Sequence, residues 1–113
     1  MTDATKTARI RELNDELRTK GYAPNGRIVA MGAFGQDGRD KQLRVVIAAA
    51  QHSDWSSGDD PYGERDFGKF EVDAEAFIFK IDYYSLDEMH GSEHPDDPNV
   101  TIRIMTLMYA SDY

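Results

Sequence analysis

The chain has 113 residues, a hydrophobic fraction of 40% and no cysteine, which suffices for one modest core and excludes disulfides, thiolate metal sites and cysteine nucleophiles. The net charge of −8 opposes binding to nucleic acid, and the chain lacks the roughly 20 consecutive apolar residues of a membrane-spanning helix and the apolar stretch of a signal peptide. We expect residues 1–113 to form a single cytoplasmic domain that binds neither membranes nor nucleic acid directly.

The first predicted element is an amphipathic helix over residues 5–20. Ile10, Leu13 and Leu17 recur on one face of it, and charged residues occupy most of the remaining surface. Gly21 follows at the position where a left-handed residue commonly ends a helix. The next apolar run, residues 27–31, is apolar on both sides and predicts a strand in the interior of a sheet.

A second helix is predicted over residues 39–51, after a loop that contains three glycines. The apolar face of this helix is expected to comprise Leu43, Val46, Ile47 and Ala50. Because residues 45–47 are β-branched, a buried strand over residues 43–49 is the alternative. Residues 53–64, rich in Ser, Gly, Asp and Pro, are predicted to form a loop.

The hydrophobic period then changes to two. Residues 67–72 and 77–84 alternate and predict a β-hairpin that turns at residues 73–75. Residues 86–98 are polar and predict a long loop, whereas residues 100–108 predict a last antiparallel strand, with a helix as the alternative. This order of elements predicts an α+β fold, in which an antiparallel sheet of about four strands packs two helices on one face.

Charge is distributed unevenly along the chain. Residues 1–50 contain nine Lys or Arg and six Asp or Glu, whereas residues 51–113 contain four and fifteen. The acidic half also contains Trp55 and most of the tyrosines and phenylalanines, which is not the composition of a disordered tail. We therefore expect a folded and strongly negative surface, which attracts basic surfaces of other proteins.

The longest motif in the chain is DDPYGERDFGKFEV over residues 59–72, and FKIDYY follows it over residues 79–84. These motifs resemble an uncharacterised domain-of-unknown-function family of short acidic proteins from alpha-proteobacteria and their plasmids and phages. The similarity extends to residues 10–14 and 91–93 and to the end of the chain. The resemblance implies an association with mobile genetic elements, but it brings no established activity and no catalytic residues.

Turn chemistry explains much of the first motif. Asp59 or Asp60 can cap the turn, Pro61 fixes its backbone angle, and Gly63 and Gly68 allow conformations or close approaches that a side chain would block. The structural interpretation of this motif is therefore a loop that packs against the sheet through Tyr62, Phe67 and Phe70.

Signatures of several enzyme classes are missing. The carboxylate-x-lysine spacing of many nucleases fails, because Ile78 and Phe67 stand two positions before Lys80 and Lys69. Neither a nucleophile elbow nor a glycine-rich phosphate loop is present. We predict no catalytic residue and no cofactor.

A small metal-dependent enzyme remains an alternative hypothesis, built on Asp66, Lys80 and Asp82 together with His90 and His94. The two histidines have the spacing that aligns imidazoles on one helix face. Glycine and proline beside them favour a loop, in which nothing enforces that alignment, so we predict no metal site there.

The favoured hypothesis is a non-enzymatic inhibitor whose acidic loops occupy a basic, nucleic-acid-binding groove on a host defence complex, as an anti-CRISPR or anti-restriction protein. A dimeric housekeeping interaction domain is a further alternative. The candidate partner-binding residues are Asp54, Trp55, Asp59, Asp60, Tyr62, Glu64, Asp66, Tyr84, Asp87, Glu88, Glu93, Asp96 and Asp97.

Overall fold

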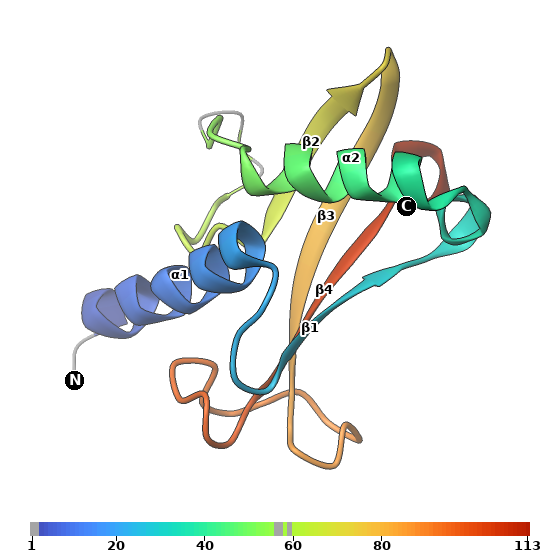
Figure 1. Cartoon of the computed structure of the whole chain (residues 1–113). Coiled ribbons are helices and arrows are strands. Elements are labelled where there is room, and N and C mark those ends of the chain that lie inside the picture. Colours follow the sequence, from blue (N-terminus) through green and yellow to red (C-terminus); the bar gives the residue numbers. More distant parts are fainter. Residues whose placement is uncertain (1–2, 56–57, 59) are drawn as a thin grey trace.

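The computed structural model describes residues 3–55, 58 and 60–113, which form two α-helices, two short 3-10 helices and one four-stranded sheet (Figure 1). The elements in chain order are α1 (Asp3–Lys20), β1 (Gly26–Ala30), η1 (Gly32–Gln36), α2 (Arg39–Ala50), β2 (Phe67–Val72), β3 (Glu75–Tyr84), β4 (Ile102–Tyr109) and η2 (Ala110–Asp112). The predicted α+β class is confirmed. Within the described residues, no helix is long and apolar enough to cross a membrane.

The sheet has the strand order β1-β4-β3-β2. The pairs β2–β3 and β3–β4 are antiparallel, whereas β1 runs parallel to β4, with Ile28 opposite Met105. The sheet is therefore mixed, and the prediction of antiparallel pairing throughout holds for two of its three pairs. β1 and β4 can run parallel because the long connection between them carries α2 and the hairpin. β1 is also an edge strand, so its predicted interior position was wrong.

The buried face of α1 agrees with the apolar stripe in its sequence. Ile10, Leu13 and Leu17 are buried, as the periodicity predicts. Gly21 adopts a left-handed φ of 72° and donates its N–H to the carbonyl of Leu17 at 2.9 Å, which ends the helix at the expected residue.

The second helix is confirmed, and the alternative strand over residues 43–49 was wrong. Its buried face agrees with the predicted one in part, because Val46 packs against the core as expected. Val45 and Ala49 are fully buried instead of Leu43 and Ile47, which are 55% and 48% exposed. Apolar residues occur on more than one side of this helix, so periodicity alone left two candidate faces.

Alanine substitutions in α2 distinguish these two faces. We expect Val45→Ala to lower the free energy of unfolding by about 1.5–2.5 kcal/mol, because it shortens a buried side chain by two carbon atoms and leaves a small cavity. Leu43→Ala, on the exposed face, is expected to change it by less than about 0.5 kcal/mol. Urea unfolding of both variants measures the difference, and a larger loss for Leu43→Ala would contradict the observed orientation of the helix.

The hairpin and the last strand are confirmed. The hairpin turns at Asp73 and Ala74, which have φ values of 52° and 66°, and this pair of left-handed residues matches the twist of the flanking strands. β4 then pairs with β3 along its whole length, so the alternative helix at the end of the chain was wrong.

Both helices pack against one face of the sheet, as predicted. The core joins Leu17 and Val45 from the helices to Phe77, Phe79 and Leu107 from the strands. Since side chains alternate along a strand, the residues of β3 between these positions, including Lys80 and Asp82, project toward the opposite face. That face carries the pocket described below.

Candidate functional site

A buried polar network connects α1, the loop before β2, and the strands β3 and β4. Asn14 Nδ2 donates to the Tyr83 hydroxyl at 2.8 Å and to the Glu64 carbonyl at 3.0 Å. The Tyr83 hydroxyl donates to Glu64 Oε1 at 2.8 Å, and Arg103 Nε donates to Asn14 Oδ1 at 2.6 Å. We call Asn14, Glu64, Tyr83 and Arg103 the anchoring network.

Arg103 extends the anchoring network toward the loop before β4. Its side chain is buried, lies 5.0 Å from the centre of the Tyr83 ring and donates a second hydrogen bond to the Pro95 carbonyl. Burial lowers the pKa of Arg103 and raises the pKa of Tyr83, whose hydroxyl also donates to the Glu64 carboxylate. Tyr83 is therefore a neutral hydrogen-bonding group at neutral pH.

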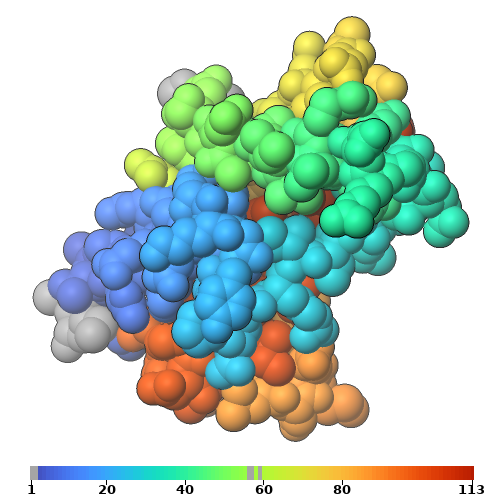
Figure 2. Space-filling view, in the orientation of Figure 1, coloured from blue at the N-terminus to red at the C-terminus, as the bar shows by residue number. Residues whose placement is uncertain are grey.

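The anchoring network holds two acidic segments, which we define as residues 53–66 and 85–101. Glu64 belongs to the first segment, and Pro95, which accepts from Arg103, belongs to the second. In Figure 2 the second segment, in orange, forms the lower end of the molecule next to α1, in blue. Contacts through Asn14 and Arg103 thus connect Glu64 of the first acidic segment to Pro95 of the second.

The predicted partner-binding residues of the first acidic segment have different environments. Asp54 and Tyr62 are exposed, with Tyr62 at 76%. Asp60 Oδ1 accepts the backbone N–H of Arg65 at 2.8 Å, which confirms that Asp60 caps the turn. The prediction for Asp59 lies outside the described residues.

Trp55 packs into the fold. The guanidinium groups of Arg18 and Arg65 lie 5.0 Å and 5.3 Å from the centre of its ring, and His52 and Phe79 meet it edge-on. These contacts give Trp55 a structural role. Its role in binding a partner stays a prediction.

Several acids of the second segment already have partners within the chain. Asp87 accepts hydrogen bonds from the Ser85 hydroxyl and the Met89 N–H, and these bonds lower its pKa. Glu88 forms an ion pair with Arg27 at 2.5 Å, and Asp97 accepts the Asn99 N–H at 2.9 Å. The other predicted residues of this region are the exposed Glu93 and the half-buried Asp96 and Tyr84.

His90 and His94 are both exposed in the second acidic segment. In the part of the chain that the structure describes, no three His, Asp or Glu side chains are grouped so that they could hold a metal ion. The histidines also stand apart from the pocket, which is lined by other residues.

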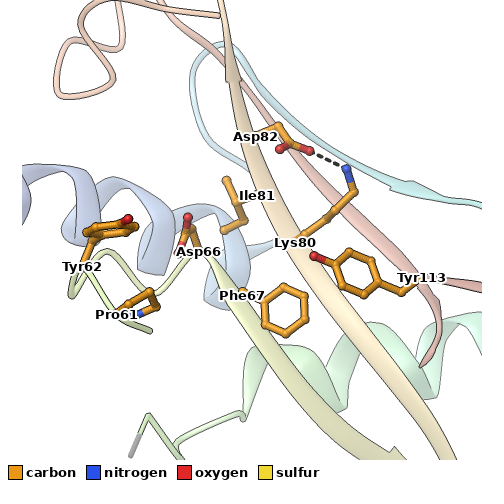
Figure 3. Close-up of a pocket in the computed structure, with 8 residues that line it drawn as sticks. All are labelled: Pro61, Tyr62, Asp66, Phe67, Lys80, Ile81, Asp82 and Tyr113. Atoms are coloured by element: carbon orange, nitrogen blue, oxygen red, sulfur yellow. Dashed lines mark hydrogen bonds and ion pairs between the residues drawn. The ribbon is translucent and has the colours of Figure 1, made fainter. Parts of the chain in front are cut away.

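A pocket of about 270 Å³ brings together Asp66, Lys80 and Asp82, three of the residues on which the alternative enzyme hypothesis is built (Figure 3). Lys80 Nζ donates to Asp82 Oδ2 at 2.8 Å. Rings of Tyr62, Phe67 and Tyr113 complete much of the wall, together with Pro61 and Ile81.

Asp66 is the carboxylate of this pocket that pairs with no basic side chain among the described residues. Burial raises its pKa, and the nearby negative charges of Glu64, Asp60 and Asp82 raise it further. The local potential around Asp66 is therefore negative and favours a cation.

The raised pKa of Asp66 predicts a pH-dependent gain in stability for Asp66→Asn. The folded state binds the Asp66 proton more tightly than the unfolded state, so ionised Asp66 opposes folding at neutral pH. We expect Asp66→Asn to be more stable than the unchanged protein at pH 7, with the difference vanishing as the pH falls below the ordinary aspartate pKa of about 3.9. Urea unfolding across this pH range measures the difference, and a variant less stable at pH 7 would contradict a destabilising charge at Asp66.

Sequence reasoning missed three polar residues that are deeply buried. Asn14, Arg18 and Arg103 are 0%, 4% and 3% exposed. Arg18 donates to the carbonyls of Ala49 and Ala50 at the end of α2, where a positive charge is favourable. The sequence of α1 contained a signal of this burial. Asn14 and Arg18 directly follow Leu13 and Leu17, so they border the apolar face of the helix.

Comparisons with known proteins identify the family. Searches of the curated proteins and of the solved structures each found no match. A scan against protein families matched residues 28–112, which run from β1 through η2, to the family described as "Protein of unknown function (DUF3768)". The match covers well over half of the chain, and the protein therefore belongs to the DUF3768 family.

Proposed function

We propose that this protein is a non-enzymatic acidic binding protein that occupies a basic groove on a protein partner. The observation that carries the proposal is the anchoring network, which ties both acidic segments to α1 and the sheet. Acidic groups held in fixed positions bind a basic surface with a smaller entropy cost than groups on a flexible chain.

The charge distribution supports this choice of partner. The second half of the chain, which contains both acidic segments, has fifteen acidic and four basic residues. Such a surface attracts basic grooves over distances of about 8–10 Å at ordinary salt concentrations, and it repels nucleic acid. A protein groove that normally binds nucleic acid has the complementary charge.

We further propose that the partner is a defence complex of the host cell and that this protein acts as an anti-CRISPR or anti-restriction inhibitor. The acidic segments would then imitate the charge spacing of a nucleic-acid backbone within the groove. The resemblance to proteins of plasmids and phages supports this choice, because such elements gain from blocking nucleases directed against them.

Affinity capture tests the proposal. The tagged protein is incubated with lysates of bacteria that contain restriction and CRISPR complexes, and the bound proteins are identified after washing at low salt and at about 1 M salt, where the Debye length is about 3 Å. We expect a nucleic-acid-binding complex that is retained at low salt and released at high salt. Excess double-stranded DNA added beforehand should prevent its capture.

Two results would count against the proposal. One is the absence of any nucleic-acid-binding complex from the retained proteins. The other is a retained complex that withstands both the high-salt wash and the DNA competitor, because contacts of that kind are not governed by charge.

The pocket favours a small enzyme as the second candidate function, because Asp66, Lys80 and Asp82 line the same cavity. An enzyme would lose its activity on a single substitution such as Asp82→Asn, whereas a charge-based inhibitor loses affinity in small steps as several acids are neutralised.

Self-association through a strand edge is a third possibility that the topology supports. Among the described residues β1 and β2 are the outer strands of the sheet, so each pairs with a neighbour on one side. Light scattering during gel filtration distinguishes a dimer from a 12.8 kDa monomer.

A further inference from the structure

The pocket between the loop before β2 and strand β3 is small and is lined by charged and aromatic side chains. Its volume of about 270 Å³ lies just below the range of about 300–1,000 Å³ that is typical of pockets for drug-sized ligands. A side chain from a partner protein is a suitable occupant for a cavity of this size.

The pocket has two carboxylates, Asp66 and Asp82, and one basic group, Lys80, so one additional positive group would balance its charge. Lys80 already neutralises Asp82 through the 2.8 Å contact, which leaves the carboxylate of Asp66 without a basic partner among the described side chains. In Figure 3 Asp66 lies on the side of the pocket near Tyr62, and Lys80 lies on the other side near Tyr113. A cation can therefore approach Asp66 without displacing Lys80.

The aromatic walls indicate which cation fits. Tyr62 is 76% exposed beside Asp66, and the rings of Phe67 and Tyr113 have centroids 5.3 Å apart on the same pocket. A planar guanidinium stacks on an aromatic face and donates several hydrogen bonds to a carboxylate at once, which a compact ammonium does not do. The chain already uses this combination at Trp55, where Arg18 and Arg65 lie over the ring.

We propose that this pocket receives an arginine side chain of the protein partner, with the guanidinium against the Asp66 carboxylate and stacked on Tyr62. The inference rests on the proposed function for the source of the arginine, since a basic groove supplies such side chains. It adds a specific contact to a surface whose other contacts are long-range and electrostatic.

A titration with small capped amino acids tests the site without the partner. We expect N-acetyl-arginine methylamide to shift the backbone amide NMR signals around residues 66–67 and 80–82, with a dissociation constant on the order of 1 mM. The matched compounds carry citrulline, which keeps the shape but lacks the charge, and lysine, which keeps the charge but lacks the planar group. Both are expected to bind at least about tenfold more weakly.

Two variants locate the binding. Asp66→Asn should weaken arginine binding at least about tenfold, and it is expected to fold because it removes a buried charge. Asp40→Asn removes an exposed negative charge on α2, outside the pocket and outside the acidic segments, and should leave the binding unchanged. Equal binding of lysine and arginine, shifts spread over residues 85–101, or arginine binding that survives Asp66→Asn would each overturn the inference.

The outcome separates this inference from the proposed function. If arginine fails to bind while a basic complex is still captured from lysate, the pocket inference is wrong and the proposed function stands. If arginine binds and no basic complex is captured, the proposed function fails. Tighter binding of free arginine than of the capped form would mean that the pocket serves a small molecule, which overturns the inference of a protein side chain.

Discussion

Replacing Arg103 with methionine is expected to lower the free energy of unfolding by about 2–4 kcal/mol. Arg103 is 3% exposed and donates to Asn14 Oδ1 and to the Pro95 carbonyl. Methionine keeps an unbranched apolar stem but has no donor, so the buried Asn14 Oδ1 and the half-buried Pro95 carbonyl both lose their partner. Urea unfolding measures this change.

Arg44→Met is the matched control for this substitution. Arg44 is 58% exposed and forms a surface ion pair with Asp73 at 3.0 Å, so its replacement is expected to change the stability by less than about 1 kcal/mol. The same small effect at Arg103 would mean that the anchoring network does not stabilise the fold. NMR signals of residues 92–97 provide a second measurement, because we expect Arg103→Met to broaden or shift them.

Replacing Gly68 with alanine is expected to cost about 3 kcal/mol of stability. An added Cβ at this position would lie 2.4 Å from Cε1 of Phe79 and 2.9 Å from Nε2 of His52. Phe79 is fully buried among the core residues, so its ring has little room to move away. Thermal and urea unfolding of the variant measure the loss.

Gly91→Ala serves as the control for Gly68→Ala. Its added Cβ would lie 3.8 Å from the Tyr83 carbonyl oxygen, an ordinary contact, and we expect the stability to stay the same or to rise slightly. Unchanged stability in the Gly68 variant would show that β2 and Phe79 are packed less closely than described here.

Local patterns were sufficient to predict the elements that depend on neighbouring residues. The stripe of Ile10, Leu13 and Leu17 defines α1, and the strict alternation around the turn at Asp73 defines the β2–β3 hairpin. The direction of β1 and the buried face of α2 depend on which distant segments they meet. The sequence pattern within β1, which has five residues, or within α2, which has twelve, does not indicate which distant segments these elements will meet.

The candidate site was predictable to a similar degree. Alternation along β3 placed Lys80 and Asp82 on one face, and the turn motif brought Asp66 close in sequence to the strand that pairs with β3. The anchoring network escaped prediction, because Asn14 and Arg103 are 89 positions apart and each looks like an ordinary surface residue in its own segment. Buried polar pairs of this kind are defined by tertiary contacts alone.

The anchoring network is expected to connect the stability of the fold to the proposed partner binding. The anchoring network places charged and polar groups inside the protein, where each depends on its hydrogen-bond partners. The same contacts connect Glu64 of the first acidic segment to Pro95 of the second. Substitutions in the network should therefore weaken both folding and partner binding, whereas substitutions of exposed acids should weaken binding alone.

The most direct test of the central claim compares two triple variants with equal charge in their binding to the captured complex. Asp54→Asn, Glu93→Gln and Asp96→Asn neutralise acids of the acidic segments, whereas Asp40→Asn, Glu71→Gln and Asp73→Asn neutralise three exposed acids elsewhere. We predict an affinity about tenfold lower for the first variant and a change of less than about twofold for the second. Equal losses in both variants would mean that only net charge matters, and no loss in the first would contradict the acidic segments as the binding surface.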